Sequence, residues 1–309
     1  MRWLTQQDRD DSGVVTLLVI GMIPVLLLAA AAAIDVSRFS QENSSAQHSA
    51  DATALAVATD CALSGSPLGA GSYEQHRKAD QAISGETPLT CGSNEVRIKI
   101  EKNVNGGLVL ERNARLVQKQ ATVRWGTLSG ANTVPLVIAD CEFGDPAVGE
   151  SIILYLDDPK PQSGCSSLPG GFSQLDKAGC SVPISAGGFV DGVTGGGGLQ
   201  NKVACITNPD PSADALPYIV LIPIYNAAAC EEAGCKGKGP YLIDGFAALN
   251  VMGYSFNGNV YDGSIGKKCP DDKERGKYCI QGTFVDYLDS QGTPGPSTDY
   301  GVKQIYLYS

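Results

Sequence analysis

The chain has 309 residues, of which 43% are hydrophobic and 18% are charged, and its formal net charge is −10. This composition excludes an intrinsically disordered chain and a protein that crosses the membrane many times. The acidic balance and an aromatic content of only 7% argue against nucleic-acid binding, because phosphate backbones attract basic surfaces.

The first predicted element is a membrane-spanning helix over residues 14–34, which follows a short N-terminal segment of residues 1–13. No charged residue interrupts this apolar stretch. At 1.5 Å per residue it would measure about 31 Å, which is the thickness of the hydrocarbon core of a bilayer. Pro24 removes one helical hydrogen bond near the middle, so we expect a kink that a membrane helix tolerates. We therefore expect membrane lipid to surround this segment.

A cleaved signal peptide is the alternative for the same stretch. Signal peptides combine a basic N-terminal region with an apolar core of about 7–15 residues. Here Arg2 and Arg9 are outnumbered by nearby aspartates, and the apolar core is longer than that range. The alanine run at residues 29–33 still satisfies the small-residue rule for cleavage. A secreted or surface-anchored protein that binds the envelope therefore stays open as an alternative.

The helix is predicted to continue beyond the membrane as a stalk over residues 35–60. Alanines recur every four residues along this segment, which places small side chains on one helical face. Such a face lets a partner approach closely. The partner is either the chain's own domain or a neighbouring subunit. The residues expected to take part in this packing are Ala46, Ala50, Asp51, Ala54 and Leu55.

Several N-terminal features occur together in a characteristic order. Gly13 leads into the apolar run that contains Pro24, and Asp35 and Arg38 form an Asp-x-x-Arg sequence where the run ends. An Ala-Asp-Ala-x-Ala-Leu-Ala element then covers residues 50–56. The combination resembles the N-terminus of Flp/Tad (tight adherence) pilus-assembly proteins of the TadE/TadG type.

This resemblance implies a retained anchor and a non-catalytic role in a Tad-type adhesive pilus or secretion system. The role would be in assembly, as a minor pilin or at the tip, with pilins or other pilus-assembly subunits as partners. Cleavage after Gly13 would place Leu18 at the fifth position, where type IV pilins need a glutamate. We therefore do not expect a processed major pilin.

Beyond the stalk, residues 61–130 predict a small α+β unit. A short helix is expected over residues 72–83, and Asn105–Gly107 predicts a hairpin turn. The expected strands of this unit cover residues 96–100, 108–110 and 116–125.

Residues 131–309 predict a β-rich exported domain, so the whole chain is expected to belong to the α+β class. Loops as long as the Gly-, Pro- and Ser-rich region at residues 159–211 need covalent staples to stay ordered. An apolar stretch over residues 135–143 opens the domain. Its expected strands cover residues 152–156, 218–222, 241–256, 278–287 and 304–308, and the stretch 241–256 is either one long strand or a bent pair.

All ten cysteines lie beyond the apolar stretch, and they are Cys61, Cys91, Cys141, Cys165, Cys180, Cys205, Cys230, Cys235, Cys269 and Cys279. An even number on one side of a membrane span indicates disulfides formed in an oxidising compartment. We expect the pairs Cys61–Cys91 and Cys269–Cys279 from their proximity, and the pairing of the others is left open. Because thiols that pair must be exported, we expect a cytoplasmic N-terminus and an extracellular or periplasmic bulk.

No residue pattern predicts catalysis, a cofactor or a metal ion. The histidines are His48 on the stalk and His76, neither beside an obvious nucleophile. The glycines at residues 195–198 lack the lysine of a phosphate-binding loop. The adjacent carboxylates at residues 157–158 and 271–272 read as solvated turns. An envelope enzyme that uses a pair of carboxylates, or an incidental calcium site, is the less favoured alternative.

Overall fold

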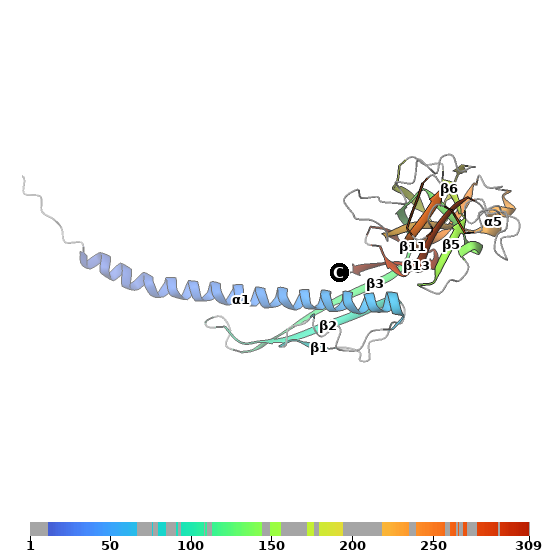
Figure 1. Ribbon diagram of the computed structural model, residues 1–309. Helices are drawn as coiled ribbons and strands as arrows, with labels where there is room; N and C mark the ends of the chain where they lie inside the picture. The colour runs from blue at the N-terminus through green and yellow to red at the C-terminus, as the bar shows by residue number, and fades with distance from the viewer. Residues whose placement is uncertain are drawn as a thin grey trace, which may run out of the picture.

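The computed structural model describes residues 12–66, 76, 80–84, 91, 94–107, 109, 113–143, 149–155, 172–175, 179–193, 218–234, 239–256, 260–263, 265, 268–270, 277–289 and 291–308. Within these residues the chain forms one long helix followed by a body rich in β-strands (Figure 1). The predicted α+β class is confirmed.

Helix α1 (Ser12–Ser64) is a single element that contains both the apolar span and the stalk. It runs without interruption through Pro24. Figure 1 shows that the first half of α1 extends away from the rest of the chain, whereas the second half lies along a sheet. The chain therefore passes from the apolar segment into the folded body without a flexible linker.

The sheet beside α1, here called the proximal sheet, is formed by strands from both ends of the chain. Its order is β1-β2-β3-β17-β14. Strands β2 and β3 pair antiparallel from Glu95 opposite Arg124 to Val104 opposite Arg115. The strands are β1 (Ala82–Ser84), β2 (Glu95–Val104), β3 (Arg115–Thr133), β14 (Tyr287–Leu288) and β17 (Val302–Tyr308).

Two expectations for this region are wrong. Residues 82–83 were expected to end a short helix, but they belong to β1 because Ala82–Ser84 pair with Lys99–Glu101 of β2. Most of the other residues of the expected helix lie outside the described part of the chain. The strand expected at residues 108–110 is also not the partner of β2, since Val104 pairs directly with Arg115 at the start of β3. Val109 lies in the connection instead.

The second sheet, here called the distal sheet, has the order β5-β13-β11-β10-β4-β6-β9, and β8, β12 and β16 also pair with β11. Its strands are β4 (Leu136–Ala139), β5 (Ser151–Tyr155), β6 (Phe172–Leu175), β8 (Phe189–Val190), β9 (Gly192–Val193), β10 (Tyr218–Tyr225), β11 (Tyr241–Phe256), β12 (Val260–Gly263), β13 (Tyr278–Val285) and β16 (Thr298–Tyr300). Two short helices, α3 (Asp140–Phe143) and α5 (Ala227–Glu232), follow β4 and β10.

Strand β11 forms the centre of the distal sheet and is buried on both faces. Ile243 and Phe246 belong to one hydrophobic cluster, and Leu249 and Val251 belong to another. A strand covered on both sides reads as a nearly continuous apolar run, which is why the sequence predicted β-structure over the same residues. Of the two alternatives, the structure has one long strand.

The two sheets meet at the end of β3, where Leu128 and Ala131 share a hydrophobic cluster with Ile243 of β11. The expected boundary between residues 130 and 131 lies inside β3, whose last residues pair with β7 (Val182–Ser185) and β15 (Thr293–Pro294). Strand β17 lies at the C-terminal end of the sequence, yet it pairs with β3 in the proximal sheet. The body is therefore not two consecutive pieces of the chain.

Candidate functional site

The first half of α1 is an apolar helix with no cover from the rest of the chain. This part of the helix is long and apolar enough to cross a membrane, and none of it is buried against the rest of the described chain. Leu17 and Leu27 are 74% and 66% exposed. A core helix of a soluble protein would bury such residues, so this segment has the character of a single membrane span or of a signal sequence. Gly13 and Pro24 both lie within it.

The second half of α1 packs on the proximal sheet through its alanine face. Ala46, Ala50, Ala54 and Ala58 are all fully buried. The side chains opposite them come from β2 and β3, and include Ile98, Ile100, Val117, Ala121, Val123 and Trp125. Small side chains let the helix axis approach the sheet closely. Of the two alternatives left by the sequence, the structure has the alanine face against the chain's own domain, and this face is not free for a neighbouring subunit.

The remaining residues of the predicted packing set lie at the edge of this contact. The side chain of Gln47 donates a 2.8 Å hydrogen bond to Asp51 Oδ1 one helical turn later. Leu55 is 39% exposed, so it points largely away from the sheet.

The C-terminal end of α1 is held at two further points. A disulfide joins Cys61 to Cys91, which precedes β2. Lys303 Nζ of β17 donates a 2.9 Å hydrogen bond to the Ala62 carbonyl oxygen. The last carbonyl groups of a helix have no partner within it, and a lysine there also complements the helix dipole. The stalk is thus fixed to strands from both parts of the sequence.

Where the apolar span ends, Asp35 meets the connection between β2 and β3. Its Oδ2 atom accepts a 2.8 Å hydrogen bond from the Val109 backbone N–H. Gly107 lies so close that a Cβ atom there would be 2.5 Å from the Asp35 carboxylate. The Asp35 side chain therefore fixes the tip of the β2–β3 connection against the helix at the end of the span.

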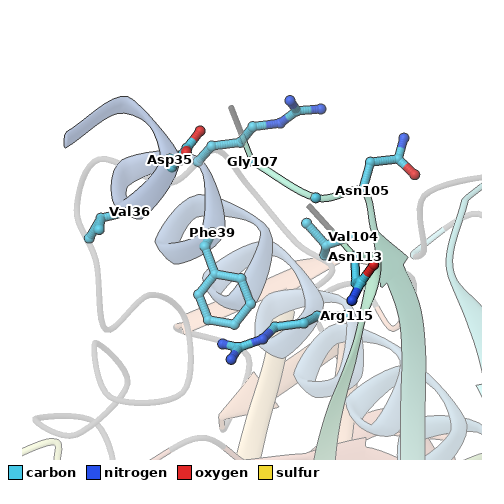
Figure 2. A pocket seen from close by; sticks show the side chains of 10 residues that line it. Asp35, Val36, Phe39, Val104, Asn105, Gly107, Asn113 and Arg115 are labelled. Carbon is cyan, nitrogen blue, oxygen red and sulfur yellow. The ribbon is translucent and has the colours of Figure 1, made fainter. Parts of the chain in front are cut away.

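A cavity of about 170 Å³ lies at this junction, here called the junction cavity (Figure 2). One wall is the turn of α1 from Asp35 to Phe39, which includes Arg38. The other wall comes from Val104 to Gly107, Asn113 and Arg115. Figure 2 shows the Arg115 side chain beside the Phe39 ring, and its Cζ atom lies 5.8 Å from the ring centroid. The Asp-x-x-Arg sequence thus lines a concave surface.

One helical turn further along, a buried cation links α1 to the sheet. Lys102 on β2 has a side chain that is only 6% exposed, and its ammonium group contacts both Glu42 on α1 and Asp80, the latter at 2.6 Å. Burial alone would lower the pKa of Lys102, but the hydrogen bonds to Asp80 and Glu42 outweigh burial and raise it. The ammonium is therefore charged at neutral pH.

The other disulfides lie in the distal part of the body. Cys269 and Cys279 are joined, with their Cα atoms 5.9 Å apart. Both pairs expected from proximity are therefore present in the structure. Cys141, Cys180 and Cys230 are disulfide-bonded as well. Cys165, Cys205 and Cys235 lie outside the described residues.

Of the residues considered for catalysis, the structure describes the two histidines. His48 and His76 are both exposed. The carboxylate pairs at 157–158 and 271–272, and the glycines at 195–198, lie outside the described residues. Among the residues that the structure does describe, no group of three or more His, Cys, Asp or Glu side chains is placed to hold a metal ion.

Sequence reasoning missed Lys102, Gly107 and Arg115. A signal for Lys102 was present, because the inward positions of β2 are apolar from Val96 to Ile100 and again at Val104. A lysine in that alternation needs a buried partner. Gly107 and Arg115 carried no comparable signal, since their importance depends on contacts with a helix far away in the sequence.

Comparison with known protein families gives a match on helix α1. The Tad family model, described as "Putative Flp pilus-assembly TadE/G-like", matches residues 13–60. This range covers the apolar half of α1, the Asp-x-x-Arg turn and the alanine face. The resemblance seen in the sequence is confirmed for these residues. No curated protein and no solved structure matches the chain.

Proposed function

We propose that this chain, which carries a TadE/G-like Flp pilus-assembly segment over residues 13–60, is a non-catalytic, membrane-anchored component of a Tad-type pilus. The apolar half of α1 remains in the membrane, and the β-rich body lies on the outer side. Its partners are pilins or other subunits of the pilus-assembly system. Its role is in assembly, as a minor pilin or at the tip.

The observation that carries this proposal is the contrast between the two halves of α1. The half that precedes Asp35 is exposed and apolar, whereas the half beyond it is fixed to the sheet by buried alanines. A cleaved signal peptide would not need to be continuous with a packed element of the mature fold. The continuity of α1 favours a span that the mature protein keeps.

The disulfides support the orientation. The cysteines within the described residues are all disulfide-bonded, from Cys61 at the end of α1 to Cys279 on β13. Disulfides persist in oxidising compartments and are rare in the cytoplasm. The body is therefore assigned to the exported side and the N-terminus to the cytoplasm.

The mechanism follows from the continuity of the helix. Because α1 enters the body without a linker, the position of the span in the membrane determines the height and tilt of the body above it. The exposed face of the span is available to lipid and to other membrane helices. The body is then presented to pilus subunits or to a surface, where binding depends on buried area rather than on a reactive group.

The proposal is tested by complementation of a deletion strain. The full-length chain is expected to restore pili and adherence. Residues 35–309 exported behind an unrelated cleavable signal are expected to reach the same compartment without restoring either. Normal pili in the deletion strain would contradict a role in assembly, and full rescue by the unanchored body would contradict a role for the anchor.

A further inference from the structure

The junction cavity lies at the depth at which lipid headgroups are expected. Ile34 is the last residue of the apolar stretch and is 58% exposed, and the next residue, Asp35, already lines the cavity. The residues from Asp35 to Phe39 occupy the first turn beyond the span. In a bilayer, this turn lies in the headgroup region.

The chemistry of the cavity combines cationic and apolar groups. Arg38 and Arg115 both line it, together with the apolar side chains of Val36, Phe39 and Val104. Guanidinium groups bind phosphate with paired hydrogen bonds, and they remain charged at any physiological pH. The lining thus matches a phosphate that is attached to an apolar tail.

The acidic residue in the lining does not cancel this match. The Asp35 carboxylate accepts the Val109 backbone N–H and lies against Gly107, so it is engaged in holding the β2–β3 connection. Among the described residues that line the cavity, Arg38 and Arg115 are cationic and Asp35 is anionic, in a chain whose formal net charge is −10. These arginines line a cavity that begins directly beyond the last residue of the apolar stretch, Ile34.

We propose that the junction cavity binds the headgroup of an anionic phospholipid in the leaflet where the span ends. Arg38 and Arg115 bind the phosphate, and Val36 and Phe39 contact the glycerol backbone and the start of the acyl chains. A lipid fits better than a free phosphate because the anchor holds the cavity within the leaflet, where lipid is concentrated, and because part of the lining is apolar. The inference rests on the retained anchor proposed above.

The test uses the full-length chain extracted from membranes and placed in nanodiscs that contain equal amounts of phosphatidylglycerol and phosphatidylcholine. Native mass spectrometry then counts the lipids that stay bound after release. We expect phosphatidylglycerol to be enriched. Arg38→Gln and Arg115→Gln are each expected to lower the enrichment about fivefold, the usual effect of one cationic side chain at an anionic surface. The matched control is Arg97→Gln, an exposed arginine on β2 that pairs with Glu95 and does not line the cavity.

Several results would overturn the proposal. Equal retention of both lipids would overturn it, and so would unchanged lipid selectivity in the Arg38→Gln variant. Because Arg38 is exposed, its replacement leaves the fold intact. Displacement of the lipid by glycerol 3-phosphate would assign the cavity to a free phosphate instead. Absence of the full-length chain from the membrane would overturn both this inference and the proposed anchor, whereas lost selectivity in an anchored chain would overturn this inference alone.

Discussion

Gly107 is a position where a single hydrogen-to-methyl change should loosen the junction between helix and sheet. Because glycine has no Cβ atom, the β2–β3 connection can approach the Asp35 carboxylate, which then accepts a hydrogen bond from the Val109 backbone N–H. Because Asp35 is a flexible side chain, a methyl group would displace it rather than the backbone. The cost is the loss of one charge-assisted hydrogen bond and not a rearrangement of the sheet.

We expect Gly107→Ala to lower the free energy of unfolding by about 1 kcal/mol, because that hydrogen bond is lost. Amide hydrogen exchange at Val109 should become faster in the same variant. The matched control is Gly126→Ala on β3, where a Cβ atom meets nothing within 4 Å. Unchanged exchange at Val109 in Gly107→Ala would show that Asp35 does not hold the connection.

Lys102 is a buried charge whose partners lie on two other segments. Since the hydrogen bonds to Asp80 and Glu42 raise its pKa above the ordinary value of 10.5, the folded protein holds this proton more tightly than the unfolded chain does. The stabilisation is therefore complete at neutral pH, well below 10.5, and it is lost as the pH rises through the folded pKa.

We expect Lys102→Met to lower the free energy of unfolding by about 1–3 kcal/mol at neutral pH, because two carboxylates lose a charged donor. The difference from the wild type should stay constant from about pH 7 to about pH 9 and shrink at higher pH. Urea unfolding at several pH values measures both. Lys99→Met is the control, since Lys99 is 40% exposed and its pair with Glu101 should contribute little. An equal effect of both variants would argue against a special role for Lys102.

At the scale of elements, the alanine face decides how closely α1 lies on the proximal sheet. Ala50 is fully buried between the helix and strands of the same chain. A larger side chain there must push the helix off the sheet, because interiors are close-packed. A substitution at Ala50 therefore acts on the folded body itself, because this position belongs to its core.

We expect Ala50→Leu to destabilise the proximal sheet by about 1–3 kcal/mol through overpacking. Ser44→Leu introduces the same side chain at an exposed position of the same helix and should have little effect. Thermal unfolding of the two purified variants gives the comparison. Equal melting temperatures for Ala50→Leu and the wild type would mean that the helix is not tightly packed on the sheet.

The disulfides Cys61–Cys91 and Cys269–Cys279 close loops of different lengths. Cys61–Cys91 spans 30 residues and joins α1 to the proximal sheet, whereas Cys269–Cys279 spans 10 residues beside β13. In the chain-entropy account, the longer loop gives the larger stabilisation. We expect the Cys61→Ser/Cys91→Ser variant to lose about 3–4 kcal/mol and the Cys269→Ser/Cys279→Ser variant to lose about 2–3 kcal/mol. Denaturant unfolding measures both, and the reverse order would contradict this account.

The sequence predicted some elements well because their signals are local. Strand β11 has an apolar run buried on both faces, and the apolar span of α1 is recognisable by length alone. Strand β1 was mistaken for the end of a helix because three residues carry too little periodicity to oppose a helical pattern. The position of β17 beside β3 was not predictable, since it depends on pairing between segments that are distant in the sequence.

The candidate site likewise combines residues with a local sequence signal and residues brought together only by the fold. Gly13, Asp35 and Arg38 could be identified from their order along the chain, and the family match covers them. The junction cavity could not be predicted, because Arg115 and Gly107 come to α1 only through the pairing of β2 with β3. Sequence order identified the helical half of the site, and tertiary structure supplied the other half.

At the scale of the whole molecule, one helix carries both the membrane segment and the packing surface of the body. The exposed apolar half of α1 and its buried alanine half belong to the same matched segment, residues 13–60. Both the proposed anchor and the junction cavity require that the mature protein keeps this helix intact.

The most direct test is the intact mass of the protein extracted from membranes, measured with and without thiol alkylation in the absence of reductant. We expect the full-length mass and no cysteine available for alkylation. Loss of residues 1–13 would instead indicate processing as in a pilin. A mass that lacks the residues up to the alanine run at 29–33 would contradict a retained anchor, because the apolar half of α1 would then be only a cleaved signal.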